Sequence, residues 1–470
     1  MELDYEKLGF KCGLECHQQL EGKKLFCSCP TLNSDKEPDI KMERKLRAVA
    51  GETGDVDIAA EFEMSKKKGF LYESSSEDTC LVETDDEPPH ELNMQALETT
   101  VKVALLLNAK IIDEIQVMRK TVVDGSNVSG FQRTALVAMD GFIETSLGKI
   151  KISTICLEEE AAQKLDEGKD FVKYRLDRLG IPLIEIATSA DIKSPEHAKE
   201  IAGHIGMVLR SVEGVKRGLG TIRQDVNISI KEGARTEIKG FQDLKSIPKV
   251  IEYEVKRQLE SIKNNKKINK EVRKAEPDFT TSFLRPLPGA ARLYPETDVL
   301  PVRVDKNYIE ELRKKLPKLL NEKIEDFEKK YSLTKELAEE LIKDKNFEKL
   351  VQKFEDEDYS IIVRTLINTP REMRNKLDYE DYEEILSYYY EGKIAKEAII
   401  DLLEKKSMGE KIDLSKFESV SEKELEKEIK KIIEENPDLN ASAYMGLAMA
   451  KYRGKVDGKK VMEILKNFLN

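Results

Sequence analysis

The stretch TIRQDVNISI, residues 221–230, decides how the first part of this chain is expected to fold. Side chains of a β-strand point alternately to its two faces. One face of this stretch is apolar: Ile222, Val226, Ile228 and Ile230. The other is polar: Arg223, Asp225, Asn227 and Ser229. The turn 231–234 leads to a second strand, in which Arg235, Glu237 and Lys239 again share a face. We therefore predict a hairpin that presents two rows of polar groups.

The hairpin allows two interpretations. Its polar rows are typical of the solvated face of an antiparallel sheet. Asn and Asp, however, are poor strand formers, so the presence of Asp225 and Asn227 in mid-strand indicates a role beyond solubility.

Upstream of the hairpin, Ser194-Pro195-Glu196 predicts the start of a helix. An apolar stripe from Ile201 to Val212, followed by Gly214, predicts that this helix packs on a core.

Length and composition predict several domains. A chain of 470 residues is too long for one hydrophobic core, so two to four domains are expected. Between 302 and 443 the only glycines are Gly392 and Gly409, and Lys, Glu and Leu recur at helical spacing. The closing stretch is locally basic, which suits an RNA contact or a solvated helix end; its cations include Lys451, Arg453, Lys455, Lys459 and Lys460.

Charge and hydropathy narrow the function classes. The net charge of −11 argues against an overall basic coat, although local patches still allow nucleic-acid binding. The first ten residues, MELDYEKLGF, hold no apolar signal-peptide core, and no run approaches 18 apolar residues. We therefore expect a soluble, cytoplasmic protein without a membrane partner.

Six cysteines in so long a chain predict no disulfide scaffold. Cys27 and Cys29, with Cys80 as a distant third thiol, form a weak zinc signal, because strong sites show two close pairs. Buried free thiols are the alternative.

Scattered acids form the other candidate site, since Gly-rich nucleotide loops and nucleophile motifs are absent from the sequence. Glu15 and His17 share one side of a short strand, and Glu185 interrupts an apolar run. A carboxylate in such a run is costly to bury unless it is paired or bound to a cation. A hard cation would satisfy Glu159 and Glu185, with His17 completing its shell. Ordinary salt bridges are the alternative.

Taken in order, the motifs of this chain resemble the GatB/GatE family of tRNA-dependent amidotransferase subunits, and its archaeal GatE branch more closely. They are GLECHQQL (13–20), KLFCSCPT (24–31), RAVAGETGDVD (47–57), CLVETDDEPPH (80–90), GSNVSGFQRTALVA (125–138), ICLEEEAA (155–162), RLGIPLIEIATSADI (178–192), GLGTIRQDVNISI (218–230), RTEIKGF (235–241), RPLPGAARLYPETD (285–298) and YMGLAMAKYRGKVDGK (444–459). The resemblance spans nearly the whole chain.

The resemblance implies an α/β cradle domain over 1–302, with mixed, largely antiparallel sheets and helices. An all-α linker domain (303–412) and a small all-α tail domain (413–470) follow. It implies that ATP phosphorylates the side-chain carboxylate of glutamate esterified to tRNA(Gln), and that ammonia then displaces phosphate. The ammonia would come through an internal channel from an asparaginase-like partner subunit, within a heterotetramer.

The resemblance also assigns roles to residues. Magnesium ligands carry over to His17, Glu159 and Glu185, with Glu15 beside them. Arg223 and Lys239 are expected on phosphate charge, and Asp225 and Glu237 on a metal water or on incoming ammonium, with Asn227 in the same pocket. Further expectations are Arg292, Tyr294 and Glu296 at this pocket, zinc on Cys27, Cys29 and Cys80 without an evident fourth ligand, and tRNA-elbow contacts from the basic tail.

One departure from the family concerns a domain resembling part of aspartyl-tRNA synthetase, which GatE proteins usually carry before the EVRKA segment (271–275). Here the chain runs straight through this point. This departure leaves open a GatB-type subunit that works with an amidase. A separate alternative, from another functional class, is a non-catalytic tRNA-binding scaffold for the ammonia-producing subunit.

Overall fold

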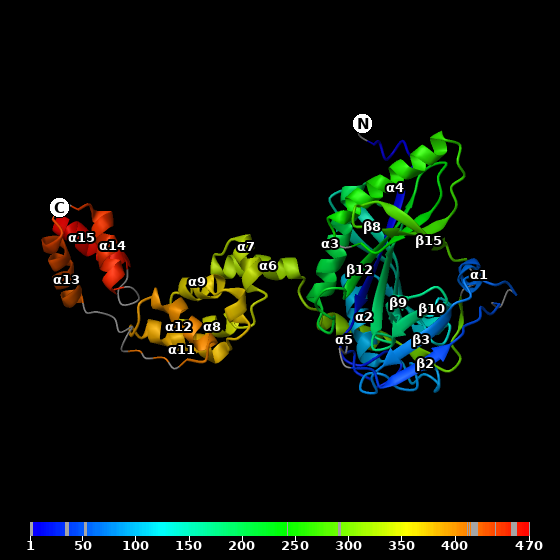
Figure 1. Cartoon of the computed structure of the whole chain (residues 1–470), viewed down its shortest axis with the longest axis horizontal. Helices are drawn as coiled ribbons and strands as arrows, with labels where there is room; N and C mark the ends of the chain where they lie inside the picture. Colours follow the sequence, from blue (N-terminus) through cyan, green and yellow to red (C-terminus); the bar gives the residue numbers. More distant parts are fainter. Residues whose placement is uncertain are drawn as a thin grey trace. The chain divides into compact units, whose positions relative to one another are not determined.

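The computed structural model describes residues 3–32, 37–50, 54–241, 243–289, 293–410, 412, 414, 422–437, 439–452 and 458–469. The described chain divides into two compact units, Met1–Leu320 and Asn321–Asn470. Figure 1 shows the chain and labels many of its elements. Among the described residues, no helix combines the length and the apolar character needed to cross a membrane.

The first unit mixes strands and helices, as predicted. Its strands are β1 (Lys11–Gln19), β2 (Ile40–Arg44), β3 (Gly69–Ser74), β4 (Lys110–Ile111), β5 (Glu114–Ile115), β6 (Val117–Thr121), β7 (Phe131–Thr145), β8 (Gly148–Glu159), β9 (Gln163–Glu167), β10 (Phe171–Arg175), β11 (Pro182–Thr188), β12 (Ile222–Ser229), β13 (Thr236–Lys239), β14 (Glu271–Ala275), β15 (Thr281–Pro286), β16 (Leu293–Pro295) and β17 (Val302–Arg303). Its helices are α1 (Ile58–Ser65), α2 (Met94–Leu106), α3 (Pro195–Ser211), α4 (Ser246–Lys263) and α5 (Lys306–Lys314).

In the described residues, eleven strands form one sheet in the order β15-β14-β13-β12-β1-β11-β8-β7-β6-β16, with β4 paired to β7. All of its pairs are antiparallel except β13 with β14. A smaller sheet has the order β2-β3-β10-β9, and β17 pairs with β5.

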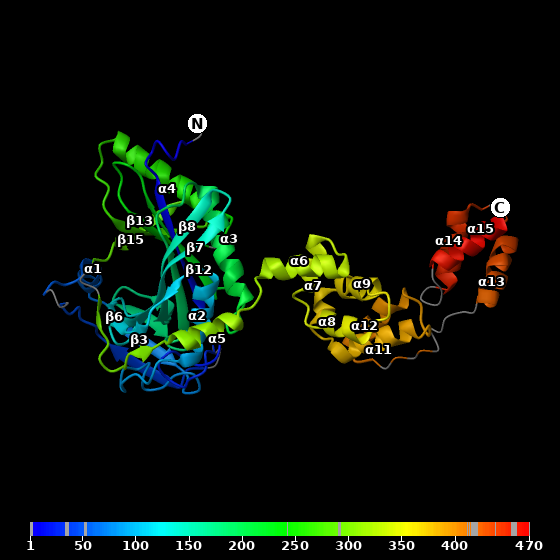
Figure 2. The same cartoon turned by 180° about the vertical axis from the view of Figure 1, so that it is seen from behind.

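One face of the large sheet packs against helices. Leu14 and Cys16 of β1 share a core with Ile201 and Ile205 of α3. Helix α2 contacts β7 and β8, and α4 contacts α3 and β12. Figures 1 and 2 show these helices along the sheet from opposite sides. The other face of the same strands remains for polar side chains.

Two local predictions are confirmed. Helix α3 starts where expected, with the Ser194 hydroxyl accepting from the backbone N–H of His197 at 3.2 Å. The predicted hairpin is β12 and β13, in which Asn227 lies opposite Glu237.

The predicted domain boundary at 302 differs from the end of the first unit at Leu320. Helix α5 contacts α2, and its Leu312 is buried in the core of the large sheet. The change of composition marks where the strands end, at β17, which comes before the first core ends.

Helices make up the described residues of the second unit. They are α6 (Leu320–Tyr331), α7 (Lys335–Leu341), α8 (Phe347–Lys353), α9 (Ser360–Asn368), α10 (Arg371–Arg374), α11 (Tyr379–Tyr390), α12 (Ala398–Ser407), α13 (Glu422–Glu435), α14 (Ala441–Tyr452) and α15 (Gly458–Leu469). Side chains of α6–α9, α11 and α12 form one core, and those of α13–α15 form another. The all-α character is as predicted, and the roles given to these domains stay predictions.

Candidate functional site

The strand register brings acids, cations and an imidazole together in rows across the large sheet. On β12, β1 and β11, Arg223 lies opposite His17, and His17 lies opposite Glu185. One step along, Glu15 of β1 lies opposite Asp225 of β12. Because these residues alternate with the buried ones that face the helices, their side chains share the free face of the sheet.

These rows form the floor of a cavity of about 950 Å³. Its acids include Glu15, Asp124, Glu158, Glu160, Glu185, Asp225 and Glu237, and its cations include Lys120, Arg178, Arg223, Arg235, Lys239 and Arg285. An aromatic ring, Phe241, and aliphatic residues such as Leu183 and Leu287 also line it. Groups of both signs therefore converge on one hollow.

A cluster with metal-ligating potential consists of His17, Glu158 and Glu185, with one ligand atom of each within 4.8 Å of the others. His17 Nε2 lies 3.2 Å from a Glu185 oxygen. Lys120 Nζ lies 2.6 Å from Glu158 and 3.8 Å from Glu185. Burial alone would raise the pKa of Glu185, but Lys120 and His17 outweigh it and lower this pKa. One imidazole and two carboxylates suit a divalent cation.

The predicted ligand Glu159 does not join this cluster. Its carboxylate accepts from the guanidinium of Arg133 at 3.2 Å and from the Arg133 backbone N–H at 3.1 Å. Alternation along β8 explains the difference. Ile155 and Leu157 are buried in the core, and Glu159, two residues further on, lies on the same face of the strand. Glu158 lies on the opposite face and reaches the cavity. The cluster therefore contains Glu158 where we predicted Glu159.

Of the hairpin residues, Arg223, Asp225, Glu237 and Lys239 line the cavity, whereas Asn227 does not. Lys239 Nζ lies 2.5 Å from Asp225 and 2.6 Å from Glu237. Burial would lower the pKa of Lys239, but the carboxylates around it raise this pKa instead. Asn227 donates to Glu15 at 2.9 Å. Burial, together with the charges of Glu185 and Glu237, raises the pKa of Glu15.

Arg223 pairs with a glutamate that we had not singled out. Its Nη2 lies 2.6 Å from one oxygen of Glu160 and 2.9 Å from the other, and Arg178 lies 4.0 Å away. Burial of Glu160 favours its neutral form, yet the two guanidinium groups lower its pKa. In the sequence, Glu158 and Glu160 flank Glu159 in the motif ICLEEEAA (155–162) and were not predicted at the site. Lys120, on β6, and Arg178, in a loop, were not predicted either.

The expectation for the LYPETD segment is wrong for Glu296. This residue is fully buried, accepts from Arg119 at 2.5 Å and from Arg133 at 2.8 Å, and does not line the cavity. Tyr294 lies on β16, near Arg119 of β6, and does not line the cavity either. Arg292 lies outside the described residues.

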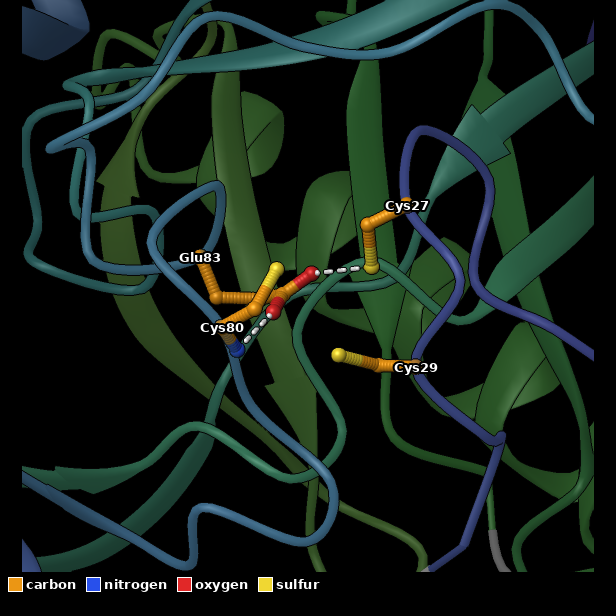
Figure 3. Close-up of side chains that lie close together, drawn as sticks. All are labelled: Cys27, Cys29, Cys80 and Glu83. Atoms are coloured by element: carbon orange, nitrogen blue, oxygen red, sulfur yellow. Dashed lines mark hydrogen bonds between the residues drawn. The ribbon is translucent and has the colours of Figure 1, made fainter.

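The thiols Cys27, Cys29 and Cys80 converge, and Glu83 joins them. Figure 3 shows the four side chains turned toward one another, and their ligand atoms lie within 4.8 Å. The Cys27 thiol donates to Glu83 at 3.0 Å, and Glu83 accepts from the Cys80 backbone N–H at 2.8 Å. Burial, then the charge of Glu83, raises the pKa of Cys29 to about 12.

The donor set of this thiol cluster fits zinc, which takes thiolates and carboxylates in a tetrahedral shell. Glu83 would be the fourth ligand that the sequence left unidentified. The signal was its spacing: Cys80 and Glu83 are separated by two residues, as in a metal-binding cysteine pair.

Of the tail cations predicted to bind tRNA, Lys451 is described. It is exposed and lies 2.7 Å from Glu428 of α13. Arg453 and Lys455 lie outside the described residues, as do the side chains of Lys459 and Lys460, which belong to α15.

The family described as "GatB/GatE catalytic domain" matches residues 10–310. The E-type subunit (GatE) of glutamyl-tRNA(Gln) amidotransferase from Methanocaldococcus jannaschii is 38% identical, over the whole of both chains. Proteins of the same name from Methanosarcina barkeri and Archaeoglobus fulgidus are 37% and 36% identical, over 98 to 99% of each chain. The alignments run over 613 to 628 positions, so these relatives carry segments absent from this chain of 470 residues.

Proposed function

The chain belongs to the GatB/GatE family, and we propose that it is the tRNA-binding, ATP-using subunit of a glutamyl-tRNA(Gln) amidotransferase. In this proposal ATP phosphorylates the glutamyl carboxylate on the RNA, and ammonia then displaces phosphate to give the glutamine amide. The observation that carries the proposal is the cavity in which His17, Glu158 and Glu185 lie beside basic side chains on one rigid sheet face. Phosphoryl transfer depends on such positioning and charge rather than on covalent catalysis.

His17, Glu158 and Glu185 would hold a magnesium ion, with Glu15 adjacent. The ion would supply positive charge to the phosphoryl group in transfer. Lys120, already 2.6 Å from Glu158, adds a fixed cation at the same place.

Arg223 and Lys239 are the cations that we assign to the phosphate oxygens. Each is held by carboxylates of the sheet, Arg223 by Glu160 and Lys239 by Asp225 and Glu237. These pairs fix the side chains in position before substrate binds, which reduces the reorganisation needed in the transition state.

Amide formation releases a proton from the attacking nitrogen, and a base must accept it. Asp225 and Glu237 are the assigned acceptors, since both are carboxylates beside Lys239 in the cavity. Glu15 lies in the same row, opposite Asp225.

The ammonia would come from an asparaginase-like partner subunit within a heterotetramer, through an internal channel. The basic tail, including Lys451, would contact the tRNA elbow.

The test incubates the full chain with glutamyl-tRNA(Gln), ATP, magnesium and ammonium chloride, without any partner. We expect ATP turnover that requires the charged RNA, and glutaminyl-tRNA as the product. RNA binding without turnover by the folded protein would favour the non-catalytic scaffold instead. A Glu158→Gln variant serves as the control for contaminating activity.

We further propose that Cys27, Cys29, Cys80 and Glu83 hold a structural zinc ion. Metal analysis of protein purified without chelator is expected to give one zinc per chain. Cys80→Ser is expected to lose it, whereas Cys12→Ala, which alters a buried thiol outside the cluster, is expected to keep it. Equal zinc content in both variants would contradict this assignment.

A further inference from the structure

A strongly basic loop joins α4 to β14 beside the cavity. Residues 263–270 read KNNKKINK and contain no acid. Lys263, Lys266, Lys267 and Lys270 are all exposed. No hydrogen bond or ion pair joins any of these four side chains to a described residue. These four lysines therefore concentrate positive charge in a chain whose net charge is −11.

The backbone of this basic loop is fixed at both ends. The N–H of Lys266 donates to Ser261 at 2.9 Å, next to Asn265 with its φ of 50°. At the far end, Leu287 donates to the Lys270 carbonyl at 3.4 Å. The lysines are therefore presented from an anchored segment, which lowers the entropic cost of ordering them on a ligand.

The basic loop adjoins the wall of the cavity. Leu287, bonded to Lys270, lines the cavity, and so does Arg235, whose carbonyl accepts from Glu271 at 3.3 Å. Arg285 of the neighbouring strand also lines it, opposite Val272. Neither arginine pairs with a carboxylate among the described residues. Positive charge thus continues from the cavity to the exposed loop.

The helix end does not account for this charge. Cations stabilise the C-terminus of a helix through its dipole, but the effect falls off within the last turn. Helix α4 ends at Lys263, so Lys266, Lys267 and Lys270 lie beyond it.

We propose that the basic loop 263–270 binds the phosphodiester backbone of the RNA whose aminoacylated end enters the cavity. This inference rests on the proposed function. Phosphate contacts position an RNA without reading its bases, so the loop should set affinity and orientation rather than the choice of tRNA.

The test compares the full-length chain with a variant in which all four lysines are replaced by serine (Lys263→Ser, Lys266→Ser, Lys267→Ser, Lys270→Ser). Binding of an uncharged tRNA(Gln) transcript is measured from low to moderate salt. At 0.1 M salt we expect Kd to rise about 10-fold or more, and the slope of log Kd against log salt to fall by about two to four, since each lost phosphate contact removes about one.

Two controls separate charge from structure. Replacing the same four lysines by arginine keeps the charge and is expected to keep Kd within about twofold of wild type. The double variant Lys149→Ser, Lys151→Ser removes two exposed lysines near the start of β8, whereas Glu158 of the cavity lies near its end. This variant should leave binding unchanged. Unchanged Kd and slope in the serine variant, or equal loss in the arginine variant, would overturn the inference. Wild-type protein that binds RNA but never turns over ATP would refute the proposed function and leave the loop's phosphate contact measurable; wild-type protein that binds no tRNA would overturn both.

Discussion

Neighbouring glutamates on β8 offer a sharp test of which face of the sheet does the chemistry. Glu158→Gln removes a charge from the cavity, 2.6 Å from Lys120 and close to Glu185. Glu159→Gln makes the same chemical change one residue later, but on the core face, where the partner is Arg133. The two variants differ little in sequence and strongly in what they touch.

The expected effects differ in kind. Loss of one preorganised charged group at a transferring phosphoryl costs about 10²–10³-fold in turnover, or about 3–4 kcal/mol. Glu158→Gln should show this loss with little change in RNA affinity, and Glu185→Gln should behave alike. Breaking a buried ion pair outright costs about 3–5 kcal/mol, but Arg133 retains Glu296 at 2.8 Å. For Glu159→Gln we therefore expect about 1–3 kcal/mol of lost stability, a melting point lower by several degrees, and near-normal turnover.

The assay is single-turnover formation of ADP from ATP with saturating glutamyl-tRNA(Gln), paired with thermal melting of each variant. If folded Glu159→Gln loses turnover as completely as Glu158→Gln, then the face of β8 on which a glutamate lies does not decide whether it acts in the reaction or in stability. The reasoning would then be refuted. Normal turnover in Glu158→Gln would refute it as well.

Three further predictions concern other parts of the first unit. Arg223→Gln should reduce ATP turnover about 10²-fold and lower stability by about 1–2 kcal/mol, because the buried Glu160 carboxylate keeps Arg178 at 4.0 Å and the Gln19 amide at 3.0 Å; a lower melting point with normal turnover would mean a structural role. Gly125→Ala should destabilise by about 2–4 kcal/mol in thermal denaturation, because its φ is 87° and a Cβ would lie 2.1 Å from the Phe70 ring, whereas Gly148→Ala, with open space and a φ of 105°, should cost only about 1 kcal/mol. Burial would raise the pKa of Glu296, but its partners Arg119 and Arg133 lower this pKa in the folded state. The stability that Glu296 contributes is therefore present above its unfolded pKa of about 4.3, and it is lost as pH falls through the folded pKa. Melting points should therefore fall less steeply below pH 4 in Glu296→Gln than in wild type, and equal slopes would contradict the assignment.

Local patterns predicted the elements that carry the site. Alternation in residues 221–230 predicted β12 and its polar face, because the period of two is set by the strand itself. The cap at Ser194 predicted helix α3, because the hydroxyl meets an unpaired backbone N–H whatever the rest of the fold.

The partners in the site could not be predicted in the same way. Lys120 stands on β6 and reaches Glu158 across β7, a contact that depends on sheet order. Which of Glu158 and Glu159 faces the cavity depends on the alternation of side chains along β8. A register irregularity opposite Ala187–Thr188 shifts this alternation by one residue within the strand. From residues alone, an acidic run gives no sign of which members point to the cavity.

The alternation of side chains between the two faces also constrains how this sheet can evolve. His17, Glu158, Glu185 and Arg223 meet because their strands are held at matched positions. Insertion or deletion of a single residue within β1, β8, β11 or β12 would turn the groups beyond it to the opposite side. Gains and losses of length are therefore tolerated in the connections between strands, whereas the strands themselves can drift only by substitution.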